Sequence, residues 1–378
     1  MAKVTPLGAG FLATLVVTGW LGVSLVLTPF FLVAVIPLPP VARVVQPIYR
    51  RVTHVVQYLW MTNVALMLEN VYGIRIEILG DVATQAAATA GTMNGERALW
   101  ISNHRTRIDW MLAWSMAVRL QVLDRLKIIL KAPLRKIPIF GWAMQHFLFI
   151  FLNRRWADDQ VMLKEYLPFL CEKEKGASFL IFPEGTDLSD QNLVKSEAFA
   201  EKNGLEKRQY SLYPRTTGWT FIFPQLRANL DAVYDITMFY VDYTPNERPS
   251  ELSLLSGRMP RTLYFYLERI KVSELPSEEK ELSTWVETRF TQKEAHLKAF
   301  YEENGKLPDG AAPLSTPDMT RPFALVVAFW GIFFLLGCQW AWSWGIISSL
   351  IFGVLIIFGY GVATIFFGGI DGILRKTL

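Results

Sequence analysis

The chain has 378 residues, of which 52% are hydrophobic, and its formal net charge is only +4. This mild charge, without a basic stripe of interleaved aromatic residues, gives no indication of nucleic-acid binding. The only two cysteines, Cys171 and Cys338, exclude a disulfide framework and a zinc-binding spacing. We therefore expect neither a nucleic-acid partner nor a metal.

The uncharged run over residues 8–40 predicts an N-terminal membrane segment, which we place at residues 1–42. The run is too long for the hydrophobic part of a secretory signal and lacks a strongly basic start, so we do not interpret it as a cleaved signal. Two alternatives remain open. Either residues 10–28 span the bilayer, or the segment bends at Pro29 and returns to the same side.

Residues 43–303 have an ordinary charged composition and predict an α/β domain, because candidate strands alternate with candidate helices. Ligands of such domains usually lie at the carboxyl ends of the strands. The small and polar stretch over residues 82–96 predicts a surface loop. The expected helices cover residues 54–72, 158–175 and 276–303, with another that starts near residue 109. The expected strands cover residues 74–79, 98–102, 126–130, 178–182, 232–243 and 261–270.

A linker with four prolines and two glycines, residues 304–322, leads into a second uncharged run over residues 322–370. This run is long enough for two crossings, so we expect two transmembrane helices over residues 323–370. The three tryptophans of residues 339–344 suit a turn at the membrane–water interface, where an amphipathic ring is stable. Residues 371–378 are expected to form a cytosolic tail.

The basic residues that flank the apolar runs predict the orientation of the chain. They are Arg43, Arg50 and Arg51 after the first run, Arg321 before the second, and Arg375 and Lys376 after it. If the C-terminal helices form a hairpin, all of these residues lie on one side, which places the central domain in the cytosol. Residues 375–378 also resemble a dibasic retrieval address of the endoplasmic reticulum, although a basic membrane flank explains them equally well.

His104 and Asp109 follow the strand expected over residues 98–102 and are the first candidates for chemistry. A histidine acts as a general base when a partner fixes its tautomer and supports its charge, and aspartate is the usual partner. Because residues five apart do not share a helix face, we expect His104 in the turn and Asp109 on the first helical turn. A polar turn in which Asp109 caps the next helix is the alternative.

Three further polar motifs follow along the chain. Residues 151–154 read Phe-Leu-Asn-Arg, residues 182–186 read Phe-Pro-Glu-Gly-Thr, and residues 214–218 read Pro-Arg-Thr-Thr-Gly. Taken singly, these motifs are explained by a helix flank, a turn, and a loop that caps a helix.

Together and in this order, the motifs resemble the glycerolipid acyltransferase family, which contains the 1-acylglycerol-3-phosphate acyltransferases. The resemblance covers residues 45–300, and residues 103–111, 182–188 and 198–205 are similar to the branch that includes lysocardiolipin acyltransferase. It implies an acyltransferase domain of the α/β class with a mixed sheet flanked by helices. An N-terminal membrane segment and a C-terminal transmembrane hairpin complete this expectation.

The resemblance implies acyl transfer from acyl-CoA, a co-substrate rather than a cofactor, to a hydroxyl of a lysophospholipid. Lysocardiolipin and lysophosphatidylinositol are the expected acceptors. His104 is then the general base, and Asp109 holds its imidazole and stabilises the cationic form. Arg154 matches the family's position for phosphate or glycerol binding. The family's acceptor-binding block matches Glu184, Gly185 and Thr186.

Asp187 departs from the family pattern, in which an arginine commonly follows Glu-Gly-Thr. The lost positive charge disfavours a phosphomonoester acceptor such as lysophosphatidic acid, whereas a phosphodiester acceptor is easier to reconcile. We expect Arg215 to supply a replacement cation. The alternatives are lysophosphatidic acid acylation and, in another class, a non-catalytic lipid-binding membrane protein. The expected location is the endoplasmic reticulum membrane, crossed more than once.

Overall fold

The computed structural model describes residues 3–35, 39–241 and 248–377. The chain divides into two compact units, each assembled from separate stretches of sequence. The first unit comprises Met1–Ala9, Ala65–Val122 and Lys175–Pro317, and the second comprises Gly10–Val64, Leu123–Glu174 and Asp318–Leu378. Residues that are distant in sequence therefore belong to one unit, which matters for the placement of each candidate site residue.

The first unit is built on a mixed sheet, as the sequence predicts, with the strand order β5-β2-β6-β7-β1-β8. Strand β2 runs parallel to both neighbours, β1 runs parallel to β7, and β6 and β7 are antiparallel. All five residues of β2 are buried, which explains its continuous apolar sequence. The strands are β1 (Arg75–Gly80), β2 (Ala98–Ser102), β5 (Ser178–Ile181), β6 (Ala232–Val241), β7 (Thr262–Lys271) and β8 (Ala312–Pro313).

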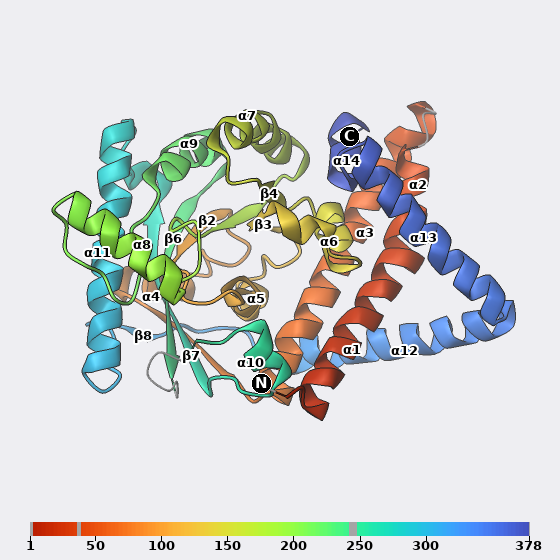
Figure 1. Cartoon of the computed structure of the whole chain (residues 1–378), viewed down its shortest axis with the longest axis horizontal. Coiled ribbons are helices and arrows are strands. Elements are labelled where there is room, and N and C mark those ends of the chain that lie inside the picture. Colours follow the sequence, from red (N-terminus) through yellow and green to blue (C-terminus); the bar gives the residue numbers. More distant parts are fainter. Residues whose placement is uncertain (1–2, 36–38, 242–247, 378) are drawn as a thin grey trace. The chain divides into compact units, whose positions relative to one another are not determined.

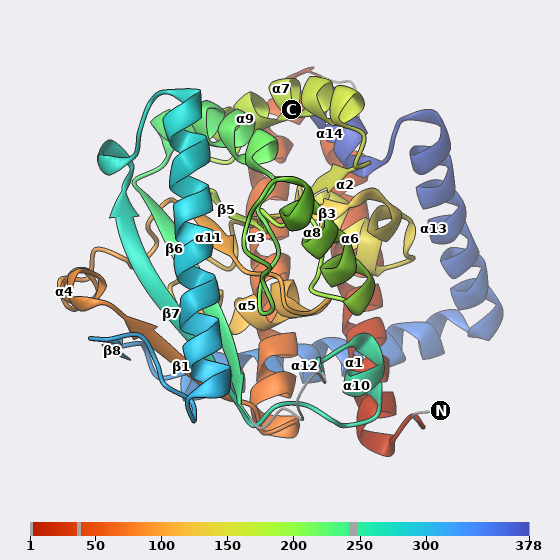
Figure 2. The same cartoon turned by 60° about the vertical axis from the view of Figure 1, so that its left-hand side comes forward.

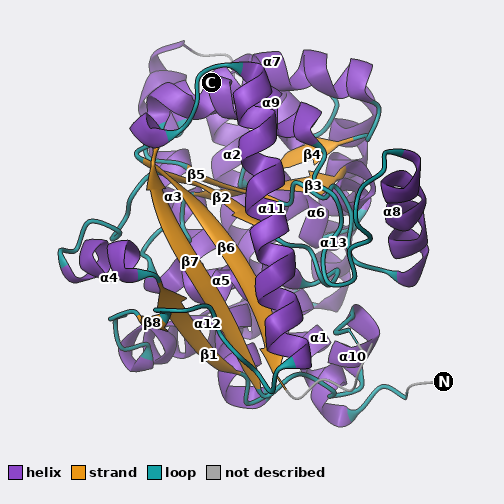
Figure 3. Cartoon of the chain, turned by 90° about the vertical axis from the view of Figure 1, so that its left-hand side faces the viewer, coloured by secondary structure: helices purple, strands orange, loops and turns teal. Residues whose placement is uncertain are grey.

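The first unit also contains helices and short helical turns. They are η2 (Met67–Val71), α4 (Val82–Thr89), α5 (Asp109–Arg119), α8 (Asp190–Lys202), α9 (Thr216–Leu226), η4 (Arg227–Asn229), α10 (Glu251–Leu255), η5 (Val272–Glu274) and α11 (Glu279–Glu302). The long helix α11 lies along β6 and β7 (Figure 2, Figure 3). Although α11 is rich in charge, its buried apolar residues recur at helical spacing and face the sheet.

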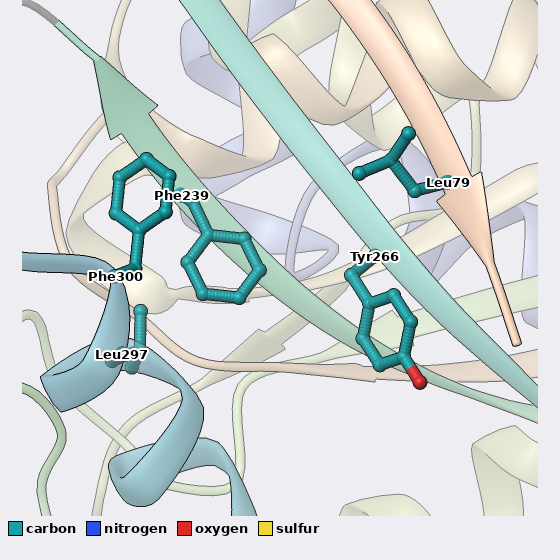
Figure 4. Packing of buried hydrophobic residues seen from close by; sticks show 5 residues of the cluster. All are labelled: Leu79, Phe239, Tyr266, Leu297 and Phe300. Carbon is teal, nitrogen blue, oxygen red and sulfur yellow. The ribbon is translucent and has the colours of Figure 1, made fainter. Parts of the chain in front are cut away.

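A cluster of buried residues joins α11 to the sheet (Figure 4). Phe239 of β6 and Phe300 of α11 are in contact, with ring centroids 4.9 Å apart. Leu79, Tyr266 and Leu297 complete the cluster. The helix and the long strands β6 and β7 are thus held by apolar burial and aromatic contact, and β6 later supplies a residue to the candidate site.

The second unit contains the apolar helices (Figure 1). Among the described residues, three helical segments are long and apolar enough to cross a membrane, namely Pro6–Val35, Thr320–Trp344 and Ile347–Phe366. The last two are consecutive and contact each other, as expected for a hairpin. The apolar elements are α1 (Pro6–Trp20), whose first residues belong to the first unit, η1 (Leu21–Leu27), α2 (Thr28–Val35), α12 (Thr320–Trp344) and α13 (Ile346–Phe366).

The second unit also contains further helices and two strands. They are α3 (Pro39–Leu66), whose last residues are in the first unit, β3 (Leu126–Lys131), η3 (Ala132–Lys136), α6 (Phe140–His146), β4 (Ile150–Leu152), α7 (Trp156–Lys173) and α14 (Ile370–Thr377). Strands β3 and β4 pair in parallel.

The first apolar segment is one continuous helical run without a turn at Pro29, as a spanning helix requires, and its crossing of the bilayer stays a prediction. The π-helical turn η1 directly precedes this proline, and the backbone N–H of Thr28 donates to the carbonyl of Val23. A π-helical turn shifts the hydrogen-bond pattern by one residue, so the helix continues past a proline that lacks an N–H. A helix of 30 residues is about 45 Å long, enough to cross a bilayer.

Three stretches differ from the expectation. The loop expected over residues 82–96 contains α4, which the Asp81 side chain caps by accepting from the backbone N–H of Thr84. The linker expected over residues 304–322 contains β8, an edge strand antiparallel to β1, and the first residues of α12. The expected tail forms α14, in which Asp371 and Leu374 are buried.

Candidate active site

His104 and Asp109 form a hydrogen-bonded pair beyond the carboxyl end of β2. Their Nδ1 and Oδ2 atoms are 3.0 Å apart. His104 lies in the turn after the strand, and Asp109 is the first residue of α5, as the spacing predicts. The Asp109 side chain is 0% exposed, whereas that of His104 is 16% exposed. The carboxylate is therefore fully buried, while one side of the imidazole is accessible to solvent.

Asp109 is held by hydrogen bonds to both of its carboxylate oxygens. Oδ2 also accepts from the backbone N–H of Thr106 at 2.9 Å, and Oδ1 accepts from the Thr106 hydroxyl at 2.8 Å. The Tyr240 hydroxyl donates to Oδ1 as well. Burial, and then the negative charge of Asp109, raise the pKa of Tyr240 well above its usual value, so the phenol stays a donor. These donors fix the carboxylate that orients His104.

Strand β6 reaches this site because it extends past the end of β2. The register pairs Ser102, the last residue of β2, with Ile236, so Tyr240 lies four residues further along β6. The side chain of Asn103 continues the ladder by accepting from the backbone N–H of Met238 at 2.8 Å and donating to its carbonyl at 3.3 Å. The turn that carries His104 is therefore anchored to the same strand that supplies Tyr240.

The main chain and the ring of His104 are both held by the turn after β5. The His104 N–H donates to Oε1 of Glu184 at 2.8 Å, and its carbonyl accepts from the N–H of Leu188 at 2.7 Å. The imidazole stacks on the Phe182 ring, with centroids 4.2 Å apart and planes 23° apart. Because Nδ1 is bound to Asp109, Nε2 is the ring nitrogen left for a substrate.

Glu184 is buried and joins three loops. Its Oε1 accepts from His104, and its Oε2 accepts from the backbone N–H of Leu212 at 2.9 Å. Burial raises the pKa of this carboxyl to about 7, although both N–H donors favour the charged form. Glu184 thus positions the loop of His104, and an acceptor molecule that bound it directly would displace one of these bonds.

Gly185 and Arg215 are packed against each other. Gly185 has a φ of +73°, a left-handed conformation that favours glycine, and a Cβ there would lie 3.0 Å from Cδ and Nε of Arg215. Arg215 precedes α9, donates its backbone N–H to the Pro183 carbonyl at 2.7 Å, and is exposed. The Thr186 hydroxyl accepts from the amide of Asn192 at 2.9 Å. The motif thus places an accessible cation beside the turn that holds His104.

Asp187 forms an ion pair within the site. Its Oδ2 lies 3.7 Å from Nε of Arg107, which is in the His104 turn and has a 58% exposed side chain. The negative charge that departs from the family pattern is therefore opposed by a positive charge from the His104 turn. Since the pair is exposed and long, it contributes little stability.

Arg154 belongs to the second unit and lies two residues after the end of β4. It is exposed and has a φ of +62°, which is unusual for a residue with a side chain. Such strain is found where a side chain must point in a set direction.

Within the first unit, the structure brings together the predicted residues His104, Asp109, Glu184, Gly185, Thr186 and Arg215.

Sequence reasoning missed several residues that shape the site. Thr106 and Asn103 flank His104 in the motif, so their spacing from Asp109 was an available signal. Phe182 was part of the quoted motif but had no assigned role. Tyr240 is 131 residues from Asp109, and nothing in the sequence links them.

Comparisons with known proteins identify the family of the chain. Residues 76–241 match the acyltransferase family, and residues 253–330 match the acyltransferase C-terminus family. Lysocardiolipin acyltransferase 1 of Danio rerio is 41% identical over 70% of this chain and 66% of its own length. The protein of the same name from Mus musculus is 36% identical over 81% of this chain and 82% of its own length.

Lysophosphatidylinositol acyltransferase 10 of Caenorhabditis elegans is 36% identical over 65% of this chain and 61% of its own length. The matched regions contain His104 and Asp109 together with the turn at Glu184. The chain therefore belongs to the acyltransferase family of enzymes, as its motifs predict.

Proposed function

We propose that the protein transfers an acyl group from acyl-CoA to a hydroxyl of a lysophospholipid. The observation that carries this proposal is the His104–Asp109 pair, in which a buried carboxylate orients an imidazole with one open side. The acyltransferase relatives that act on lysolipids, by their names, point to the same class of acceptor.

The proposed reaction uses this geometry. The acceptor hydroxyl attacks the thioester carbonyl as Nε2 of His104 takes its proton, so a carbon–oxygen bond forms and the carbon–sulfur bond breaks. Asp109 stabilises the imidazolium, and the thiolate of CoA leaves and regains a proton from it. Because the lipid supplies the attacking oxygen, no nucleophile from the protein is needed.

The acceptor we propose carries a phosphodiester, as in lysocardiolipin or lysophosphatidylinositol. Asp187 lies in the turn beside His104, and its pairing with Arg107 lowers the positive charge available to an acceptor. Exposed Arg215 is the proposed phosphate contact in the first unit, and the role of Arg154, which belongs to the second unit, rests on the sequence resemblance alone. A doubly charged phosphomonoester would require more compensating charge than this turn offers.

The membrane setting supports a lipid substrate. The part of the chain that the structure describes has three helical segments long and apolar enough to span a bilayer, which supports association of the enzyme with the surface where both substrates partition. We propose that the protein crosses the membrane of the endoplasmic reticulum with its catalytic residues in the cytosol, in agreement with the basic flanks of the apolar runs.

The test is acyl transfer by the purified full chain in lipid nanodiscs, with acyl-CoA and three acceptors assayed in parallel: lysocardiolipin, lysophosphatidylinositol and lysophosphatidic acid. We expect product with the first two and little with the third. The same assay compares His104→Ala with a matched control, His296→Gln, which removes a histidine that packs on Tyr266 and not on Asp109. Product from lysophosphatidic acid alone would establish the alternative acceptor, and no product with any acceptor would contradict the proposal.

A further inference from the structure

A cavity of about 340 Å³ lies in the first unit beside the His104 turn. It begins at Arg105, the residue that follows His104. Two arginines, two uncharged polar residues, one leucine and one carboxylate line it: Arg105, Arg248, Gln209, Tyr210, Leu193 and Asp190. These formal charges sum to one net positive charge, so the cavity favours an anion.

Arg105 is buried and forms no ion pair with a carboxylate of the described residues. It is only 6% exposed, and its Nε atom is buried with no hydrogen-bond partner among the residues that the structure describes. Its guanidinium lies over the ring of Tyr301 at 4.2 Å from the centroid, and Tyr301 stacks on Tyr210 at 5.3 Å. The aromatic pair fixes the position of the guanidinium and leaves its buried donor without an acceptor, which is costly unless a ligand supplies one.

Arg248 is the second cation of the cavity, and it comes from a different segment. Its Nη1 is 3.0 Å from Oδ1 of Asp190, whose side chain is 92% exposed. Its Nε is also buried without a partner in the described part of the chain. An ion pair with so exposed a carboxylate is weak, so a stronger anion that enters the cavity can replace Asp190.

Arg289, in the same unit, is by contrast an arginine paired with carboxylates. Its guanidinium donates to the carboxylates of Asp235 and Glu268, so its charge is fully compensated. Arg105 and Arg248 instead keep unused donors at one cavity. Guanidinium groups bind phosphate oxygens through paired hydrogen bonds, which makes phosphate the anion that this arrangement suits best.

We infer that the cavity lined by Arg105 and Arg248 binds a phosphate group of a substrate while His104 acts on the hydroxyl. The inference rests on the proposed function and adds a phosphate site to it. The phosphate comes either from the CoA portion of the donor or from the head group of the acceptor. The chemistry is the same in both cases, and kinetics separates the two sources.

The experiment compares the full chain with Arg105→Gln and Arg248→Gln in nanodiscs and measures KM for acyl-CoA and KM for lysophosphatidylinositol separately. We expect one of the two KM values to rise about 10-fold to 100-fold, because hydrogen bonds to a charged group are lost. The value of kcat and the thermal midpoint should change little. Arg105→Lys should recover part of the affinity, since it keeps the charge without the paired donors.

Lys195→Gln is the matched control, because Lys195 is an exposed cation on α8 that does not line the cavity. A selective rise in KM for acyl-CoA assigns the site to the donor, and a selective rise for lysophosphatidylinositol assigns it to the acceptor. Unchanged KM values, or an equal loss of kcat with both substrates kept at saturation, would overturn the inference.

Calorimetric binding of CoA and of lysophosphatidylinositol to the same proteins distinguishes failure of the phosphate site from failure of the proposed function. If the wild-type chain transfers no acyl group, the proposed function fails. The cavity is still tested in that case, because its arginine variants must weaken the binding of one of these two compounds. Equal binding by wild type and variants would reject the phosphate site alone.

Discussion

His104 of the first unit and His146 of the second are both hydrogen-bonded through a ring nitrogen, yet their surroundings differ in two respects. His146 is fully buried, and Tyr49 and Tyr360 occupy its Nδ1 and Nε2, each at 2.6 Å. Burial, and then the charge of Arg50, lower the pKa of His146 to about 3. His104 has a carboxylate on one nitrogen and an open side at the other. A base needs both features, and burial with hydrogen bonds alone yields a neutral structural histidine.

The buried carboxylates show the same contrast. Glu174 of the second unit contacts Arg50, His54 and Lys127 at 2.6 to 3.0 Å. Burial opposes its ionisation, but Lys127 and Arg50 outweigh burial and hold the pKa of Glu174 well below its usual range. Its negative charge is neutralised by the cations of this cluster. Asp109 instead orients a histidine that faces outward, so its charge is available to the reaction.

The largest expected effect separates the two histidines. His104→Ala should lower kcat by about 100-fold to 10,000-fold, the usual contribution of a general base. His146→Gln should retain most of the turnover but lower the free energy of unfolding by about 1 to 3 kcal/mol, because a buried hydroxyl loses its partner. Acyl-transfer rates and thermal melts measure both. Equal loss of turnover in the two variants would show that His104 and His146 do not differ in their role.

The next effect concerns the orientation of His104. Asp109→Asn should lower kcat by about 100-fold or more, because the amide reverses a donor–acceptor contact and favours the wrong imidazole tautomer. Tyr240→Phe removes one donor to the same carboxylate and should cost about 10-fold at most. Steady-state rates with both substrates saturating provide the comparison. If Tyr240→Phe were as damaging as Asp109→Asn, the hydroxyl would have a more direct role.

Glu184 should give stability an unusual dependence on pH. Its pKa is raised from about 4.5 in the unfolded chain to about 7 in the folded protein, so the folded state holds an extra proton between these values. Raising the pH through this window therefore favours unfolding, and stability falls from pH 4.5 to 7 and is then constant. Glu184→Gln should remove this fall. If melting curves of both proteins showed the same change of stability with pH across this window, the assignment of the change to Glu184 would be wrong.

The smallest expected effect is at Arg215. Arg215→Ala should raise KM for the lysophospholipid several-fold, roughly the value of an exposed charge–phosphate contact, without a change in KM for acyl-CoA. Arg227→Ala is not a suitable control, because that guanidinium donates to backbone carbonyls. Lys195→Gln serves instead. Unchanged acceptor affinity in Arg215→Ala would show that the replacement cation lies elsewhere.

Local patterns predicted much of the fold. The strand over residues 98–102 and the start of α5 at Asp109 were correct because a continuous apolar run and a polar turn are both local signals. The apolar helices at both ends were predictable for the same reason. The helix α4 was missed because its small residues resembled a loop, although Asp81 was a readable cap.

Long-range contacts could not be predicted. The two-residue strand β8 exists only because β1 offers a free edge. The Tyr240–Asp109 contact depends on how far β6 extends past β2, which is a property of the sheet register. The buried Arg105 likewise follows from the packing of Tyr301 from α11. The pairing of His104 with Asp109 and its support by Thr106 are local, whereas Tyr240 and Glu184, which also hold the pair in place, come from distant parts of the chain.

The most direct test of the central claim is whether the acyl group passes straight from thioester to lipid. Rapid quenching during turnover, followed by the intact mass of the chain and assay of the lipid product, answers this in one sample. If His104 acts as a base on the lipid hydroxyl, product accumulates while the protein mass stays that of the free chain. A burst of acylated protein, whether at His104 or Cys171, would contradict the account.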